Sequence, residues 1–213
     1  MAESTIKTSE PAYGPTDLDS HVHLPTNTGL SNEKLTMWAF LGSDCLLFGA
    51  LISTYLLLRN RTGRDSTGPT AADLFDIPFT SASSFVLLMS SLTMVLAVSS
   101  ISRGEIERCK MWLLTTATLG AMFIAGQVYE FTSFYREGLG YTTNISASAF
   151  YTLTGFHGVH VSLGIVMLVT MWTLVQRGAL TQANAETVEI IGLYWHFVDI
   201  VWIVIFAIVY LIP

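Results

Sequence analysis

The sequence predicts an all-α, polytopic membrane protein that forms a bundle of five transmembrane helices. Only 12% of its 213 residues are charged, about half the share of a typical soluble domain, and its mean hydropathy is +0.52. At 1.5 Å per residue, about 20 helical residues cross the hydrocarbon core of a bilayer. Five stretches reach that length, namely Leu35–Leu58, Phe79–Ile101, Met111–Phe131, Ala147–Val175 and Ile190–Ile212. They lack the period-two alternation of a membrane β-barrel.

The chain divides into a polar tail over residues 1–34 and a membrane domain over residues 35–213. The tail is rich in Pro, Ser, Thr and acidic residues and has no apolar core typical of a signal peptide, so we expect it to be flexible. The first apolar stretch then acts as the targeting signal. His21 and His23 have no third ligand nearby and indicate a solvated tail rather than a metal site.

The connections predict antiparallel neighbouring helices in one domain. The longest connection runs from Arg59 to Asp76, and the others are short. With the amino terminus inside, six basic residues lie on the inner side and four on the outer side. The inner ones are Lys7, Lys34, Arg103, Arg108, Lys110 and Arg177, and the outer ones are Arg59, Arg61, Arg64 and Arg136. This excess predicts a cytoplasmic amino terminus and an external carboxyl terminus.

Several classes of function are excluded by what the sequence lacks. There is no glycine-rich phosphate loop, no nucleophile elbow and no basic patch, and the net charge of -6 argues against a nucleic-acid partner. Cys45 and Cys109 form no CxxC motif and are expected to be free thiols.

Six ionisable side chains lie within the apolar stretches and are the candidate functional residues. A charged side chain at the centre of a membrane helix costs roughly 2.5–3.5 kcal/mol, so such groups usually pair inside a bundle or line a polar path. The six candidates for pairing or for proton support are Asp44, Glu130, His157, His160, His196 and Asp199.

Their depths along the helices suggest partners. Counted at about 1.5 Å per residue, Asp44 and His160 lie within about one helical turn of each other, which predicts a buried pair. The depths of Glu130 and His157 permit a second pair. His196 and Asp199 stand one turn apart on the last helix, where they can bond to each other or to backbone.

The same residues do not make a convincing metal or haem site. Haem-binding bundles commonly place paired His residues about four turns apart on a helix, whereas His157 and His160 are one turn apart and His196 is alone on its helix. No third ligand accompanies the His-x-x-His pair. We therefore predict no catalytic residue, no cofactor and no metal in this chain.

Small residues recur every four positions and predict close helix packing. One row consists of Thr154, Gly158 and Ser162, and the other of Ala117, Ala121 and Ala125.

Three motifs in this order resemble subunit III of the haem-copper terminal oxidases. They are Gly126–Phe131 (GQVYEF), Thr154–Val161 (TGFHGVHV) and Tyr194–Trp202 (YWHFVDIVW), and the resemblance extends from the first helix to the carboxyl terminus. It implies a bacterial inner-membrane subunit without redox cofactors, which supports assembly, stability and proton uptake of an oxygen reductase. Haem and copper are then expected in partner subunits I and II, with phospholipids and a larger respiratory supercomplex as further partners.

The sequence departs from the long-form family in two places. Five spans replace seven, as in many bacterial members, so the first two family helices are absent. Asp44 also stands where the long form carries Glu. Asp44 with Cys45 and the segment Asp73–Phe79 resemble quinol oxidases, whereas Gly126–Glu130 and Tyr194–Phe197 resemble cytochrome c oxidases. The residues leave the electron donor open, with cytochrome c oxidase as the main interpretation.

Two other classes remain as alternatives. An accessory subunit of a nitric oxide reductase would share the general pattern, and a free-standing transporter would also carry intramembrane carboxylates. The copurifying subunits distinguish these possibilities.

Overall fold

The computed structural model describes residues 31–59 and 74–212, and the predicted tail up to residue 30 lies outside them. The described chain forms α1 (Asn32–Leu58), α3 (Ile77–Ser102), α4 (Ile106–Arg136), α5 (Ile145–Gln176) and α6 (Ala185–Phe206). A short 3-10 helix (Gln182–Asn184) precedes α6, and a π-helical turn (Ala207–Leu211) continues it. These elements supply five helices long and apolar enough to cross a membrane. The described residues contain no strand, so the predicted fold class is confirmed.

Side-chain caps place the starts of three helices before the apolar stretches begin. The capping oxygens belong to Ser31, Asp76 and Asn144, and each accepts a hydrogen bond from the backbone N–H three residues later, at 3.3, 3.1 and 2.6 Å. Such caps satisfy N–H groups that have no partner within the helix. The helices can therefore extend beyond the hydrocarbon core.

Glycines with positive φ end α3, α4 and α5 in the same way. Gly104, Gly138 and Gly178 have φ values of 77°, 91° and 73°. After each glycine, the next residue donates its N–H to the carbonyl five positions earlier, as Leu139 does to Phe134. This bonding defines the Schellman motif, which needs a left-handed residue that glycine adopts without strain. Each of these turns ends its helix.

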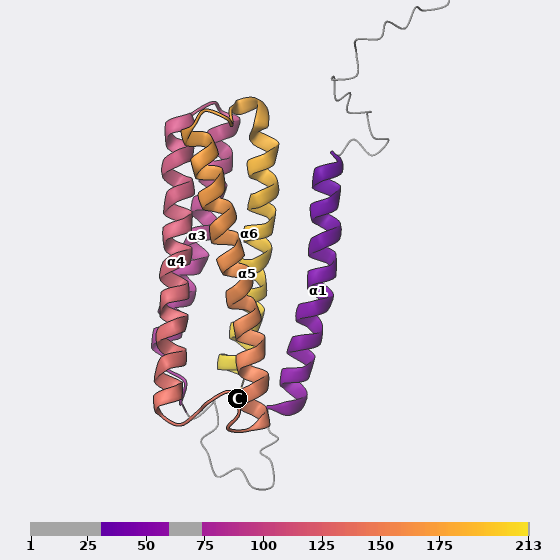
Figure 1. Ribbon diagram of the computed structural model, residues 1–213, viewed down its shortest axis with the longest axis vertical. Coiled ribbons are helices and arrows are strands. Elements are labelled where there is room, and N and C mark those ends of the chain that lie inside the picture. Colours follow the sequence, from indigo (N-terminus) through magenta and orange to yellow (C-terminus); the bar gives the residue numbers. More distant parts are fainter. Residues whose placement is uncertain (1–30, 60–73, 213) are drawn as a thin grey trace, which may run out of the picture.

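The helices alternate in direction, with α3, α4, α5 and α6 packed as one bundle and α1 at its edge beside α5 and α6 (Figure 1). Only one stripe of α1 is buried, consisting of Leu41, Asp44, Phe48 and Tyr55. At the end where α1 begins, Lys34 of α1 forms an ion pair of 2.7 Å with Glu189 of α6. Much of α1 therefore faces outward from this chain.

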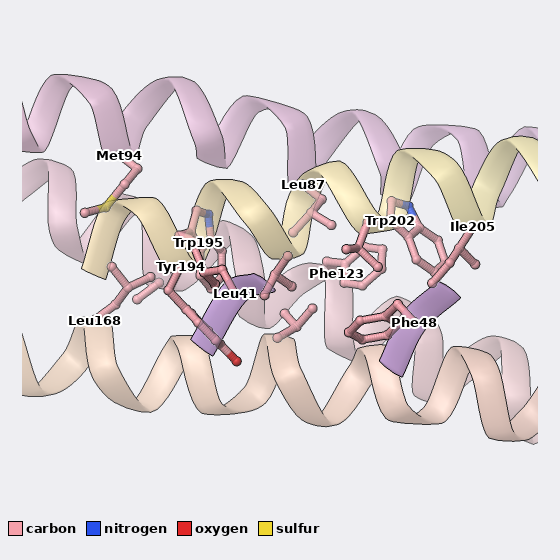
Figure 2. Packing of buried hydrophobic residues seen from close by; sticks show 14 of the residues in the cluster. Leu41, Phe48, Leu87, Met94, Phe123, Leu168, Tyr194, Trp195, Trp202 and Ile205 are labelled. Carbon is pink, nitrogen blue, oxygen red and sulfur yellow. The ribbon is translucent and has the colours of Figure 1, made fainter. Parts of the chain in front are cut away.

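The bundle closes around the tryptophans of α6, which point into the core with Phe123 and Leu87 (Figure 2). The indole of Trp195 fits between two helices because glycine stands on each. A Cβ added at Gly120 would lie 2.5 Å from Trp195, and one at Gly164 would lie 2.8 Å from it. Close packing in this bundle therefore depends on glycines of α4 and α5.

The predicted row of alanines does not form a contact between helices. Ala117 is buried, but Ala121 and Ala125 are exposed on the outside of α4. The buried face of α4 includes Thr116, Gly120 and Gln127 instead. Thr154 and Gly158 of the other row do face α4, because Gln127 donates to the carbonyl of Thr154 at 2.9 Å and a Cβ at Gly158 would meet the same side chain at 2.8 Å.

Candidate functional site: polar pairs between the helices

Asp44 and His160 meet between α1 and α5, as their depths predict. The distance from His160 Nε2 to Asp44 Oδ2 is 3.6 Å, which is contact within an ion pair but too long for a hydrogen bond. His160 Nδ1 lies 2.7 Å from the carbonyl oxygen of Phe156. The edge of the Phe48 ring packs on the imidazole with ring centroids 5.0 Å apart, and Tyr194 donates to the backbone carbonyl of His160 at 2.9 Å.

The hydrogen bond from His160 to Phe156 determines which ring nitrogen faces Asp44. A carbonyl oxygen only accepts, so Nδ1 must carry hydrogen and donate it to Phe156. In a neutral imidazole, the lone pair of Nε2 would then face an ionised carboxylate and repel it. One proton on either Nε2 or Asp44 turns this repulsion into attraction.

Glu130 and His157 do not pair with each other, which corrects the expectation from depth. Glu130 accepts a hydrogen bond of 2.8 Å from Thr80 of α3. His157 is fully buried and donates from Nε2 to the carbonyl of Val198 on α6, at 3.2 Å. Compatible depths were insufficient because Glu130 of α4 is directed to α3, whereas His157 of α5 is directed to α6.

The ring of His157 is held by aromatic neighbours. Its centroid lies 4.8 Å from that of Trp202 and 5.8 Å from that of Phe123, whose ring meets it edge-on. Within the described structure, His157 Nδ1 has no hydrogen-bond partner. The imidazole of His157 is therefore packed within the aromatic core of the bundle.

His196 and Asp199 are connected through a third side chain. Ser91 of α3 donates to Asp199 Oδ2 at 2.5 Å, and His196 Nδ1 lies 3.1 Å from the same hydroxyl oxygen. The expectation that the two residues bond to each other or to backbone is therefore corrected: among the described residues, both side chains hydrogen-bond to Ser91.

The hydroxyls of α3 were missed as partners for the other helices. Trp195 and Trp202 donate their indole N–H groups to Ser90 and Ser84, at 3.0 and 2.9 Å. The signal that could have revealed them is the density of Ser and Thr in the second apolar stretch. Each of these hydroxyls satisfies a polar group that lipid cannot satisfy.

The described residues contain no group of three or more His, Cys, Asp or Glu side chains placed to hold a metal ion. The site is instead a set of separate polar contacts between helices. The fold and these contacts define the class: a multi-pass membrane bundle whose intramembrane ionisable groups bond between neighbouring helices.

Comparison with known proteins identifies the family. Residues 23–212 match the model of the family described as "Cytochrome c oxidase subunit III". The chain is 39% identical over 180 residues to "Cytochrome c oxidase subunit 3" of Bacillus sp. (strain PS3), covering 84% of this chain and 86% of that protein. It is 37% identical over 195 residues to the protein of the same name from Alkalihalophilus pseudofirmus, covering 91% and 93%.

A relative with a different stated donor matches equally well. The chain is 38% identical over 180 residues to "Probable quinol oxidase subunit 3" of Staphylococcus saprophyticus, covering 84% of this chain and 89% of that protein. The chain belongs to the cytochrome c oxidase subunit III family, and it is subunit III of a haem-copper oxidase. The family resemblance seen in the three sequence motifs is thus confirmed.

Proposed function

We propose that this chain is a non-catalytic subunit that supports proton uptake, assembly and durability of a cytochrome c oxidase. The observation that carries the proposal is the Asp44–His160 contact of 3.6 Å between α1 and α5. It joins the edge helix to the bundle and is suited to hold one proton within the membrane. Its partners are subunits I and II, which would contain the haem and copper, and the complex can join a larger respiratory supercomplex.

Phospholipid is the second kind of partner in this proposal. A groove of about 370 Å³ runs along α4 and α5 and is lined by apolar side chains that include Ile124, Val128, Phe131, Val159 and Leu163. An acyl chain fits such a surface because it offers dispersion contacts and needs no hydrogen bonds. The chain would lie in the bacterial inner membrane with its amino terminus in the cytoplasm and its carboxyl terminus outside.

A quinol oxidase is the second candidate, favoured by the 38% identity to the quinol oxidase relative. The two candidates differ in the electron donor, which other subunits would bind. Oxidation of reduced cytochrome c by the purified complex supports the first, and oxidation of a quinol without cytochrome c supports the second.

Purification through a tag on this chain tests the proposal. In a mild detergent we expect a haem-copper core that reduces oxygen to copurify with it. Removal of this chain from the complex should leave the haem spectrum unchanged and should shorten the time over which turnover is maintained. Isolation of the chain alone, or with a core that reduces nitric oxide, would contradict the proposal.

A further inference from the structure

Ser91 places its hydroxyl between two ionisable side chains of a neighbouring helix. Its oxygen lies 2.5 Å from Asp199 Oδ2 and 3.1 Å from His196 Nδ1. Both distances are within the range over which a proton passes along a hydrogen bond. Asp199 and His196 are one turn apart on α6, so the hydroxyl of α3 bridges them.

Two buried serines of α3 have different partners. Ser84 and Ser90 donate to backbone carbonyls of their own helix, at 2.7 and 2.5 Å, and accept from the indole N–H groups of α6. An indole N–H acts only as a hydrogen-bond donor and cannot accept a proton. Those hydroxyls therefore hold the helices together, whereas the two partners of Ser91 can each gain or lose a proton.

A serine hydroxyl has one hydrogen to donate, which allows two arrangements. In the first, protonated Asp199 donates to Ser91, and Ser91 donates to Nδ1 of His196. In the second, Asp199 is ionised, Ser91 donates to it, and Nδ1 of His196 carries hydrogen and donates to Ser91. In each arrangement, one hydrogen lies in the contact between Asp199 and Ser91, and another lies in the contact between Ser91 and His196.

We propose that Ser91, Asp199 and His196 form a proton-transfer unit in which Ser91 relays a proton between the carboxyl and the imidazole. The hydrogen of Asp199 Oδ2 passes to the serine oxygen as the serine hydrogen passes to Nδ1. One O–H bond breaks at Asp199, one N–H bond forms at His196, and Ser91 keeps one hydrogen throughout. The hydrogen on Nε2 of the imidazolium then passes to a water molecule at the partly exposed ring, which leaves a neutral imidazole. The use of this unit in proton uptake rests on the proposed function, but the transfer is a property of the three side chains.

Burial gives the relay a direction of exchange. Asp199 is 4% exposed, and its Oδ1 atom has no hydrogen-bond partner within the described residues. His196 is only partly buried. Within the described part of the chain, Ser91 is the hydrogen-bonded neighbour of the Asp199 carboxyl, and the more exposed His196 is the next group along the chain of hydrogen bonds.

The ionisable groups on the helices around α6 are engaged elsewhere. The described length of α3 contains no ionisable side chain between Ile77 and Ser102. On α5, His157 donates to the carbonyl of Val198, and His160 contacts Asp44 of α1. No ion pair among the described residues involves Asp199 or His196, so Ser91 is the group that connects them.

Hydrogen–deuterium exchange of the Asp199 carboxyl tests the relay without using turnover. The full chain is kept in the complex with which it purifies and is transferred into D2O. The shift of the protonated carboxyl C=O band is followed by infrared spectroscopy, and the band is assigned by its loss in Asp199→Asn. Ser91→Ala should slow the shift by about tenfold or more, because the bridge is missing.

Matched variants separate a relay from a structural hydroxyl. Ser91→Thr retains the hydroxyl and should exchange at the wild-type rate. Ser90→Ala removes the neighbouring hydroxyl, which has no ionisable partner, and should also exchange at that rate. His196→Gln should slow exchange as Ser91→Ala does. If Ser91→Ala fails to assemble, the exchange rate of His196→Gln tests the relay in its place. Wild-type exchange in Ser91→Ala or in His196→Gln, or the lack of an Asp199 band at every pH tested, would overturn the proposal.

Discussion

Replacement of Gly120 by alanine should destabilise the bundle although it adds a single methyl group. The new Cβ would lie 2.5 and 3.0 Å from two carbon atoms of Trp195 and 3.3 Å from Ile165. Carbon atoms in favourable contact lie about 3.5–4.0 Å apart. The indole has little freedom to move, because Gly164 packs against other atoms of the same ring, where an added Cβ would lie 2.8 Å away, and because its N–H bonds to Ser90.

Gly155 provides the matched control within the next helix. A Cβ added there has nothing within 4 Å, so alanine at Gly155 causes no overpacking. At either position alanine gains about 1 kcal/mol of helix propensity over glycine. Overpacking at Gly120 costs about 1–3 kcal/mol. The two variants should therefore differ by roughly 1–3 kcal/mol in the free energy of unfolding, with Gly155→Ala the more stable.

Heating the purified complex and measuring release of this chain gives the comparison. For a chain of this size, the difference corresponds to about 2–12 °C in the midpoint of release. Equal midpoints for Gly120→Ala and Gly155→Ala would refute the argument that the tryptophan requires glycine on α4.

Two further predictions concern assembly and composition. Gly158→Leu should cause loss of the chain from the purified complex, because even an added Cβ would lie 2.8 Å from Gln127. Unchanged yield and subunit stoichiometry would show that this packing is unimportant. The separately expressed chain should contain no haem or copper, because the described residues offer no cluster of three metal ligands, and a pyridine haemochrome spectrum with about one haem per chain would contradict that.

The helices were predictable from sequence because hydrocarbon imposes a simple condition on length and polarity. Leu35–Leu58 and Phe79–Ile101 lie within α1 and α3, which extend beyond them by at most three residues at an end because polar caps and turns lie there. The row of alanines did not predict a contact between helices, since Ala121 and Ala125 lie on the outer side of α4. Spacing along one helix does not specify which face meets a neighbour.

Partners of the ionisable residues were predictable only where depth and rotation agreed. Asp44 and His160 share a depth and face each other. Glu130 and His157 satisfy the depth condition but are directed at different helices. Ser91 was missed because a serine in an apolar stretch usually bonds to its own helix backbone, and only the packing of α3 on α6 reveals its different role.

Asp44→Asn tests most directly the claim that this chain supports catalysis without performing it. An asparagine amide can donate to Nε2 of a neutral His160, so the α1–α5 contact should survive and the complex should assemble. The carboxyl that could hold a proton is lost, while the haem and copper that the proposal assigns to other subunits would be untouched.

The measurement is the initial rate of oxygen uptake by the assembled Asp44→Asn complex and its decline over many turnovers. The account predicts unchanged haem content, an initial rate near that of the wild type, and an earlier decline. Immediate loss of activity in a fully assembled complex would contradict it and would place an obligatory proton path through Asp44.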